Sequence, residues 1–319
     1  MKDYCLLLTL FFTFSCTSMP LIKLDGTKID KLKDRTVIAL WPKGTKGINP
    51  KKLEKKRQGE NLFYDIHNPS LTLFQPEKPN GSAVIVIPGG GYSVVSFNLE
   101  GVPIATKLME EGVTVFILKY RLPTTKSEFK HPIPLMDAQR AIKIVRYHAD
   151  TFNVDTKKIG LLGFSAGGHL ASTAGTWFNK PVNSNGSIGK TNCRPDFMML
   201  IYPVITTEGK GISHPCPKSL IGKKSEVGLL KKLSNELNVT VNTPPTFLAH
   251  AKDDQAVPAQ NSILFHKALK KCGVETTIKL YKSGGHYTGF FDKKAGHDAL
   301  NWMEDSLIWL REMKLIPKK

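Results

Sequence analysis

The chain alternates short apolar runs with segments of helical periodicity from about residue 70 onward. The runs at 83–87 and 113–118 are almost entirely apolar, which is typical of strands covered on both faces of a sheet. Between and after them, residues 98–111 and 134–150 carry apolar side chains at helical spacing. Strands that alternate with helices predict an α/β fold, with a mainly parallel central sheet flanked by helices on both faces.

The same rhythm continues almost to the end of the chain, so we expect one domain over 70–319. Its later elements are expected as strands at 158–162, 197–202, 246–249 and 277–281, and as helices at 166–177, 258–271 and 296–313. Residues 205–235 interrupt the pattern, because they are rich in Gly, Lys, Ser and Pro. We expect them to form a cap-like excursion above the sheet.

The first 18 residues contain a separate apolar run at 5–14, preceded by Lys2. That run is shorter than the roughly 20 residues of a membrane-spanning helix, and it predicts a signal peptide over 1–18. Phe14-Ser15-Cys16 also resembles a loose bacterial lipobox, with cleavage before Cys16 and lipidation of its thiol. Lipidation, plain cleavage and retention stay open. The expected location is secreted, periplasmic or lipid-anchored at a bacterial outer membrane.

The chain has a net charge of +18, part of which lies in a basic N-terminal extension, residues 19–69. Within it, residues 20–60 carry 12 Lys or Arg against 5 Asp or Glu, and 51–57 is the densest run. Such a surface attracts acidic polysaccharide or anionic lipid, although a solvated lysine-rich face is the simpler interpretation. No nucleic-acid partner is expected, since the lysines lack a binding motif and interleaved aromatic residues.

Five cysteines are present, of which Cys5 and Cys16 fall in the expected signal peptide. The odd remainder, Cys193, Cys216 and Cys272, argues against a disulfide framework. Three buried thiols are expected, with a Cys193–Cys216 bridge as the alternative. No His/Cys cluster has metal-ligand spacing, so neither a metal nor an organic cofactor is expected.

Gly163-Phe164-Ser165-Ala166-Gly167 follows a predicted strand directly and begins a predicted helix. A serine hydroxyl becomes a useful nucleophile when a sharp turn exposes it beside a base and anion-stabilising amides. A strand–turn–helix elbow does this by holding the serine in a strained conformation, and the two glycines avoid steric clashes there. The motif predicts Ser165 as a nucleophile.

Pro88-Gly89-Gly90-Gly91-Tyr92 follows an earlier predicted strand. Consecutive glycines let backbone amides approach a ligand closely, as an oxyanion hole requires. One amide is expected from Ala166, the residue after the serine, and the second from Gly90 or Gly91.

The base is expected in a loop after the last strand, where Ser283-Gly284-Gly285-His286-Tyr287 lies. His286 is the only histidine in a glycine-rich turn that leaves a late strand. His169 lies one helical turn after the nucleophile and His250 ends a strand, so both are expected to support the site without reacting.

A carboxylate that orients the histidine is expected between the serine and the histidine. Asp253 and Asp254 follow the predicted strand at 246–249, where functional groups of open parallel sheets gather. Asp254 begins a D-x-x-V-P pattern and is assigned to the triad. Asp253 is expected to be a solvated neighbour.

These residues, in this order, resemble the α/β-hydrolase superfamily over about 70–315. Within it, the chain resembles the acetyl esterase/lipase branch that includes bacterial acetyl xylan and feruloyl esterases. The stretches that carry this resemblance are PGGGY (88–92), LKYRLP (118–123), GFSAGGHLAS (163–172), LIYPV (200–204), PPTFLAH (244–250) and DDQAVP (253–258). Two positions depart from relatives: Pro88 replaces the His of HGGG-type lipases, and Tyr287 replaces a common Gly.

The residues themselves predict a serine hydrolase that works through an acyl-enzyme intermediate. The resemblance implies short-chain, chiefly acetyl, esters, with an acylated carbohydrate such as xylan or a small ester as the substrate. Two alternatives remain: a serine peptidase of the prolyl-oligopeptidase kind, and a non-catalytic glycan-binding or adhesion module on the same scaffold.

Overall fold

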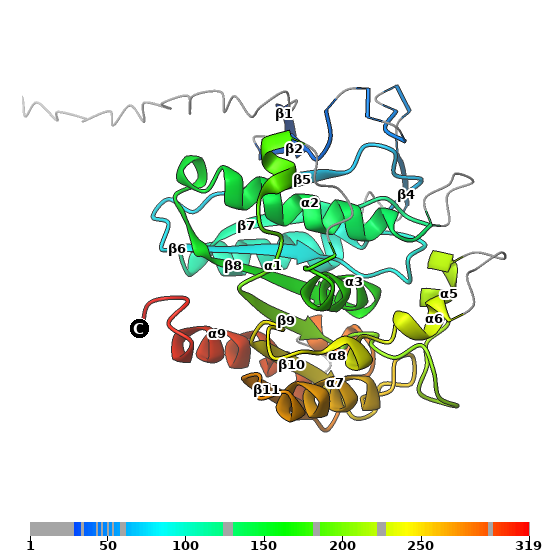
Figure 1. Ribbon diagram of the computed structural model, residues 1–319. Helices are drawn as coiled ribbons and strands as arrows, with labels where there is room; N and C mark the ends of the chain where they lie inside the picture. Colours follow the sequence, from blue (N-terminus) through cyan, green and yellow to red (C-terminus); the bar gives the residue numbers. More distant parts are fainter. Residues whose placement is uncertain are drawn as a thin grey trace, which may run out of the picture.

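The computed structural model shows a central sheet with helices packed on both of its faces (Figure 1). It describes residues 29–32, 35–42, 44–45, 47–49, 51–52, 54–57, 62–123, 130–180, 186–221, 228–292 and 296–318. The expected signal peptide at 1–18, including Cys16, lies outside these ranges. In the described ranges, no helix is long and apolar enough to cross a membrane.

The central sheet has nine strands in the order β1-β2-β5-β7-β6-β8-β9-β10-β11. The strands from β6 to β11 are mutually parallel, whereas β1, β2 and β5 add an antiparallel edge. The bounds are β1 (Ile29–Leu32), β2 (Arg35–Ala39), β5 (Ser70–Phe74), β6 (Gly81–Ile87), β7 (Thr114–Lys119), β8 (Val154–Phe164), β9 (Phe197–Ile201), β10 (Thr246–Ala251) and β11 (Thr276–Tyr281). A separate hairpin pairs β3 (Lys55–Arg57) with β4 (Leu62–Tyr64).

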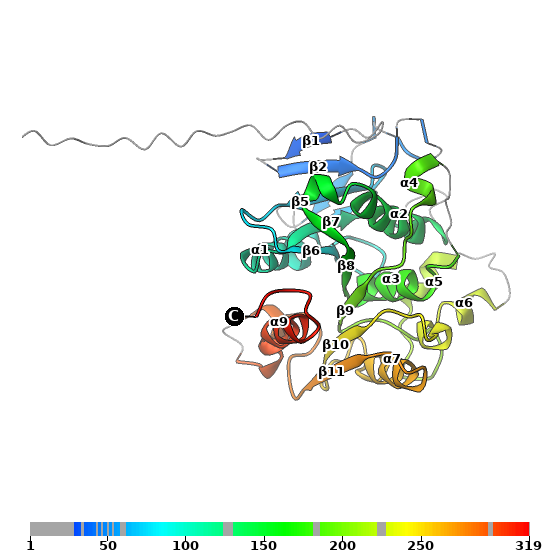
Figure 2. The same ribbon diagram turned by 60° about the vertical axis from the view of Figure 1, so that its left-hand side comes forward.

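Figure 2 shows the two helical layers, with α1 and α9 on one face of the sheet and α2, α3 and α7 on the other. The α-helices are α1 (Val102–Glu110), α2 (Ile133–Tyr147), α3 (Ser165–Thr176), α4 (Gly186–Lys190), α5 (Cys216–Ile221), α6 (Leu229–Lys232), α7 (Gln260–Lys271), α8 (Thr288–Phe291) and α9 (Trp302–Glu312). Shorter turns of other helix types are η1 (Phe97–Gly101), η2 (Asp150–Phe152), η3 (Asn235–Asn238) and η5 (Asp298–Asn301). The predicted α/β fold class is confirmed.

The inner strands are apolar because helices cover both of their faces. Every residue of β9 and β10 is buried, and so are nearly all residues of β6 and β7. Parallel strands end at the same edge of a sheet, so the loops after β6, β8, β10 and β11 meet there. Those four loops carry the residues expected to react.

The expected boundary at residue 70 needs a correction, because the sheet begins earlier in the chain. Strand β2 pairs antiparallel with β5, through Ile38 opposite Leu71, and β1 pairs with β2. Part of the basic extension is therefore integral to the fold. The sequence did not suggest this because β1 and β2 are short and carry charged or polar residues (IDKL and RTVIA), unlike the continuous apolar runs of the inner strands.

The segment expected as a cap, 205–235, carries α5 and α6 and reaches the start of η3. Leu233 in this segment is fully buried, and its carbonyl oxygen lies 2.9 Å from Nε2 of His169. The segment is thus packed onto α3. Cys193, Cys216 and Cys272 are free thiols, so the alternative Cys193–Cys216 bridge is not formed, and Cys272 is only half-buried.

Candidate active site

Ser165 lies at a sharp turn between β8 and α3. Its φ angle is 51°, in the left-handed region that costs free energy for a residue with a side chain. The turn is so tight that a Cβ on Gly163 would lie 2.5 Å from the Gly167 carbonyl oxygen, and one on Gly167 would lie 2.1 Å from that of Ile87. The predicted strained elbow is present, and it requires both glycines.

The structure brings the three expected side chains together from three separate loops. The Ser165 hydroxyl oxygen lies 2.9 Å from Nε2 of His286, and Nδ1 of His286 lies 2.7 Å from a carboxylate oxygen of Asp254. The Asp254 side chain is fully buried, whereas 23% of the His286 side chain is exposed. A substrate can therefore reach the imidazole and the hydroxyl, while the carboxylate stays out of water.

Asp254 is held by more groups than the imidazole alone. Its Oδ1 accepts the backbone N–H groups of Ala256 and Val257, at 2.9 and 2.8 Å, and its Oδ2 lies 3.2 Å from Nε2 of His250. Burial by itself would raise the pKa of Asp254, but the hydrogen bonds with His250 and His286 outweigh it and hold the pKa below its usual range. Asp254 is therefore an anion at neutral pH.

Asp253 has a structural contact that the sequence did not predict. Its side chain accepts the backbone N–H groups of Gly284 and Gly285, at 3.2 and 2.8 Å. These glycines immediately precede His286, so the two adjacent aspartates hold the loop and the ring separately. Asp253 is exposed, as expected of a solvated neighbour, and its contacts with the loop are an additional role.

The glycine loop after β6 lies against the elbow. A Cβ on Gly89 would lie 3.0 Å from Cβ of Ser165, so the loop and the nucleophile are in contact. Gly90 and Gly91 have φ angles of 123° and 62°, and within the described chain their backbone N–H groups donate no hydrogen bond. Ala166 lies in the first turn of α3, where N–H groups lack helical acceptors. The glycine loop and the first turn of α3, where the oxyanion donors are expected, thus both lie beside Ser165.

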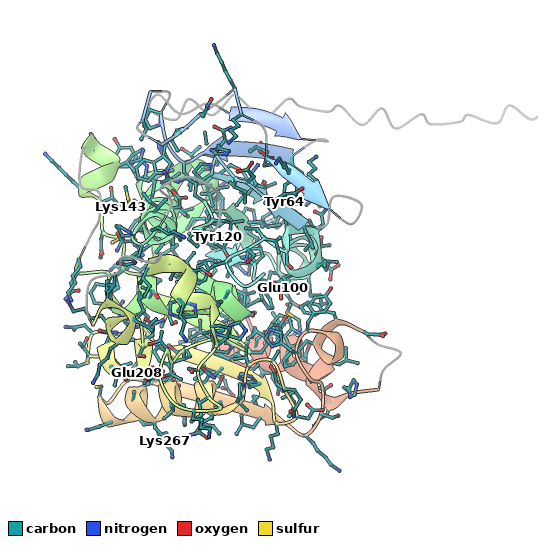
Figure 3. The ribbon with its side chains drawn as sticks, turned by 90° about the vertical axis from the view of Figure 1, so that its right-hand side faces the viewer. Tyr64, Glu100, Tyr120, Lys143, Glu208 and Lys267 are labelled. Atoms are coloured by element: carbon teal, nitrogen blue, oxygen red, sulfur yellow. The ribbon has the colours of Figure 1, made fainter. Side chains whose placement is uncertain are left out.

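Glu100 is a buried residue of the site that the sequence analysis missed. Its Oε2 accepts the backbone N–H of Gly89 at 2.6 Å, and its Oε1 accepts the Tyr202 hydroxyl at 3.0 Å. Burial raises the pKa of Glu100 to about 7, although both hydrogen bonds and the nearby charge of His286 oppose the rise. Glu100 is buried, and Figure 3 labels it near the middle of the view, below Tyr120.

Tyr202 connects Glu100 to the imidazole. Its ring centroid lies 4.7 Å from that of His286 in an edge-to-face arrangement, and its backbone has a φ angle of 37°. The next residue but one, Val204, donates its backbone N–H to the Ser165 carbonyl oxygen. The LIYPV stretch therefore supports both the base and the elbow.

His169 and His250 support the site from within the core, as expected. The imidazole of His169 is fully buried between the Tyr92 hydroxyl and the Leu233 carbonyl, each at 2.9 Å. Burial lowers the pKa of His169 to about 4, so it is neutral. His250 is fully buried between Ser262, Val257 and Asp254. Neither ring contacts the Ser165 hydroxyl.

The arrangement can activate a hydroxyl and stabilise an oxyanion beside it. Among the residues that the structure describes, no group of three or more His, Cys, Asp or Glu side chains could hold a metal ion. The groups that are present are those of nucleophilic acyl transfer: a hydroxyl, a base oriented by a carboxylate, and backbone N–H donors.

Comparisons with known proteins agree with this geometry. The chain is 33% identical over 248 residues to an acetylxylan esterase of Xylanibacter ruminicola, covering 76% of this chain and 48% of that protein. It is 33% identical over 226 residues to endo-1,4-beta-xylanase B of Butyrivibrio fibrisolvens, covering 71% and 34%. The chain thus spans about half or less of these curated relatives.

One solved structure matches this chain over nearly the whole length of the solved protein. It is an acetyl ester-xyloside bifunctional hydrolase from Caldicellulosiruptor lactoaceticus, with a TM-score of 0.74 and 34% identity, covering 88% of this chain and 97% of that one. A carboxylesterase of Lactobacillus plantarum, 24% identical with a TM-score of 0.67, shares the fold. The family model of BD-FAE matches residues 71–269. Because that match spans more than half of the chain, the chain belongs to the BD-FAE family, with the α/β-hydrolase fold.

Proposed function

We propose that this protein is a serine esterase that cleaves short-chain carboxylic esters, chiefly acetyl esters, on carbohydrates such as xylan. The observation that carries the proposal is the continuous hydrogen-bonded chain from the Ser165 hydroxyl through His286 to Asp254. The substrate class is supported by the names of the relatives, which include an acetylxylan esterase and an acetyl ester-xyloside hydrolase.

The reaction begins when Ser165 attacks the ester carbonyl carbon while Nε2 of His286 takes the hydroxyl proton. The negative charge that develops on the carbonyl oxygen is stabilised by the backbone N–H groups of Ala166 and of Gly90 or Gly91. Asp254 stabilises the imidazolium that forms. The imidazolium then protonates the departing alcohol, and the C–O bond breaks to leave an acyl group on Ser165.

Water completes the cycle by the same route. His286 removes a proton from the water, which attacks the acyl carbon, and the released Ser165 oxygen takes that proton back. The products are a carboxylic acid and the free enzyme. Each step uses only groups that the site contains.

A fluorophosphonate probe and a panel of esters test the proposal together. The wild-type protein should be labelled at Ser165 and should release p-nitrophenol faster from the acetyl than from the octanoyl ester, and acetate from acetylated xylan. Ser165→Ala should lose both labelling and turnover. Labelling without any ester hydrolysis would contradict the esterase assignment, and peptidyl substrates in the same panel test the serine-peptidase alternative.

We also propose that the protein is exported and tethered to a bacterial membrane through lipidated Cys16. The support lies in the sequence, in the apolar run at 5–14 and in the Phe14-Ser15-Cys16 segment. Feeding an alkyne-bearing fatty acid to expressing cells should label the wild-type chain but not Cys16→Ala. Equal labelling of both chains, or none of the wild type, would contradict the tether.

The basic segment at 51–57 is proposed to contact acidic polysaccharide. Lys51 and Lys52 are exposed, and 63% of the Lys55 side chain is accessible to solvent. Replacing these three lysines with glutamine should weaken retention of the protein in a gel that contains polygalacturonate. Unchanged retention would leave the segment as a solvated surface.

A further inference from the structure

A cavity of about 250 Å³ lies apart from Ser165, His286 and Asp254. It is bounded by the β3–β4 hairpin, by strands β2, β5 and β7, and by η1 with the start of α1. Its wall contains three cationic side chains, one carboxylate and three phenyl rings. The residues that matter most are Arg35, Glu54, Lys119 and Phe74.

The cations of this cavity exceed its anions. Glu54 is occupied by Lys119, whose ammonium lies 2.6 Å from a carboxylate oxygen. Burial alone would raise the pKa of Glu54, but the charges of Lys119 and Lys56 outweigh it and lower the pKa. The carboxylate of Glu54 is therefore ionised, and its charge interacts with Lys119 and Lys56. The described residues of the cavity wall include no second carboxylate that could pair with Arg35.

Arg35 carries a buried donor without an acceptor. Its guanidinium carbon lies 3.6 Å from the centroid of the Phe74 ring, so the cation packs over the face of that ring. Its Nη1 is buried and has no hydrogen-bond partner. A buried N–H donor on a cation costs free energy unless an acceptor meets it, and burial lowers the pKa of Arg35 with no opposing charge.

The remainder of the wall has the chemistry that binds a sugar ring. Phe63 and Phe97 line the cavity with apolar rings, and Ser70 and Thr72 line it with hydroxyl groups. The volume is below the roughly 300–1,000 Å³ of sites for drug-sized ligands, so the cavity suits one sugar unit. A guanidinium binds a carboxylate through two parallel N–H···O bonds.

We propose that this cavity binds one uronic acid unit of an acidic polysaccharide, with the sugar carboxylate on Arg35 and the ring against the phenyl side chains. The choice of a sugar acid rests on the proposed function, because a carbohydrate esterase meets such units on its substrate. The binding itself needs none of the reacting groups. The cavity would hold the polysaccharide while the ester is cut elsewhere on the same chain.

Isothermal titration calorimetry on the full chain carrying Ser165→Ala tests the proposal in 150 mM NaCl. D-glucuronate should bind, while D-glucose and acetate should bind at least tenfold more weakly. Adding Arg35→Met should weaken glucuronate binding at least tenfold. Lys267→Met is the matched control, because Lys267 is an exposed cation on α7, at the opposite end of the molecule from the hairpin residue Tyr64 (Figure 3).

Two further measurements separate loss of binding from loss of folding. Arg35→Lys keeps the charge without the two-pronged geometry, and it should bind glucuronate more weakly than wild type with the same melting temperature. In the protein that keeps its Ser165 nucleophile, the Arg35→Met variant should hydrolyse p-nitrophenyl acetate at the wild-type rate. The proposal is overturned if glucuronate binds no better than acetate, or if Lys267→Met weakens binding as much as Arg35→Met. Esterase failure with intact glucuronate binding would overturn only the proposed function.

Discussion

The carboxylate of Glu100 accepts the backbone N–H of Gly89 at 2.6 Å, immediately before Gly90 and Gly91, which are expected to supply an oxyanion donor. Through its other oxygen it accepts the hydroxyl of Tyr202, whose ring packs on His286. One buried side chain thus joins the oxyanion loop to the base. Glu100 contacts no reacting atom, so it is a positioning residue.

Replacing Glu100 with glutamine should lower kcat with little change in KM. The amide has nearly the same shape and can still accept from Gly89, but it removes the negative charge near the imidazolium. Complete loss of an oxyanion donor costs roughly 10²–10³ in rate; here the loop keeps its acceptor and only the charge is lost, so kcat should fall less, about tenfold. Steady-state kinetics with p-nitrophenyl acetate measure the effect.

The matched control for this change is Glu110→Gln, because Glu110 is exposed and forms an ion pair with Lys107 on the surface of α1. Its kcat should equal that of the wild type. A Glu100→Gln enzyme with unchanged kcat and a raised KM would show that Glu100 affects ground-state binding and not the oxyanion loop.

As the pH rises, the free energy of unfolding of the wild-type protein should fall relative to that of the Glu100→Gln variant. Burial raises the pKa of Glu100 from 4.5 to about 7, so the folded state binds this proton more tightly than the unfolded chain does. The contribution is full below pH 4.5 and is lost as the pH rises through 7. The shift corresponds to about 3 kcal/mol, measurable by urea unfolding at pH 5 and pH 8. A difference between the two proteins that is independent of pH would contradict it.

The neighbouring aspartates should give different defects. Asp254→Asn removes the carboxylate that orients His286, and loss of such a carboxylate lowers kcat by about 10⁴. Asp253→Asn keeps one acceptor oxygen for the loop amides, so kcat should fall less than tenfold. Rates with p-nitrophenyl acetate separate the two, and fluorophosphonate labelling of both variants reports on Ser165. Equal defects would mean that the loop and the ring are not held separately.

The sequence predicted the fold and the triad because their signals are local. A continuous apolar run indicates a strand covered on both faces. Gly163 and Gly167, within a few residues of it, indicate a tight turn. Both glycines are required by backbone contacts below 3 Å, and no other residue type fits. The order of the strands places the loops after β8, β10 and β11 at one edge without knowledge of any side-chain contact.

The sequence could not predict Glu100 or the role of Asp253, because both depend on distant contacts. Glu100 lies in η1, among residues that resemble the start of an ordinary surface helix, and its partner Tyr202 lies 102 residues further along the chain. Asp253 and Asp254 have the same side chain. Only the path of the His286 loop decides which of them meets the ring and which meets the amides.

The N-terminal strands should depend on a buried ion pair between Arg121, just after β7, and Asp137 of α2. Asp137 is fully buried and accepts hydrogen bonds from Nη2 of Arg121 at 2.6 Å and from Nε1 of Trp41 at 2.7 Å. Asp137→Ala leaves a buried guanidinium without its carboxylate, so it should lower the free energy of unfolding by about 3–5 kcal/mol. Asp150→Ala, an exposed carboxylate at η2, should change it by less than about 0.5 kcal/mol.

Urea unfolding monitored by tryptophan fluorescence measures both variants, and Trp41 is itself a reporter of the affected contact. At low temperature, where both remain folded, their rates with p-nitrophenyl acetate should be close to wild type, because the ion pair contacts none of the three triad side chains. Equal stability of Asp137→Ala and Asp150→Ala would mean that Trp41 and β2 are held mainly by the pairing of β2 with β5.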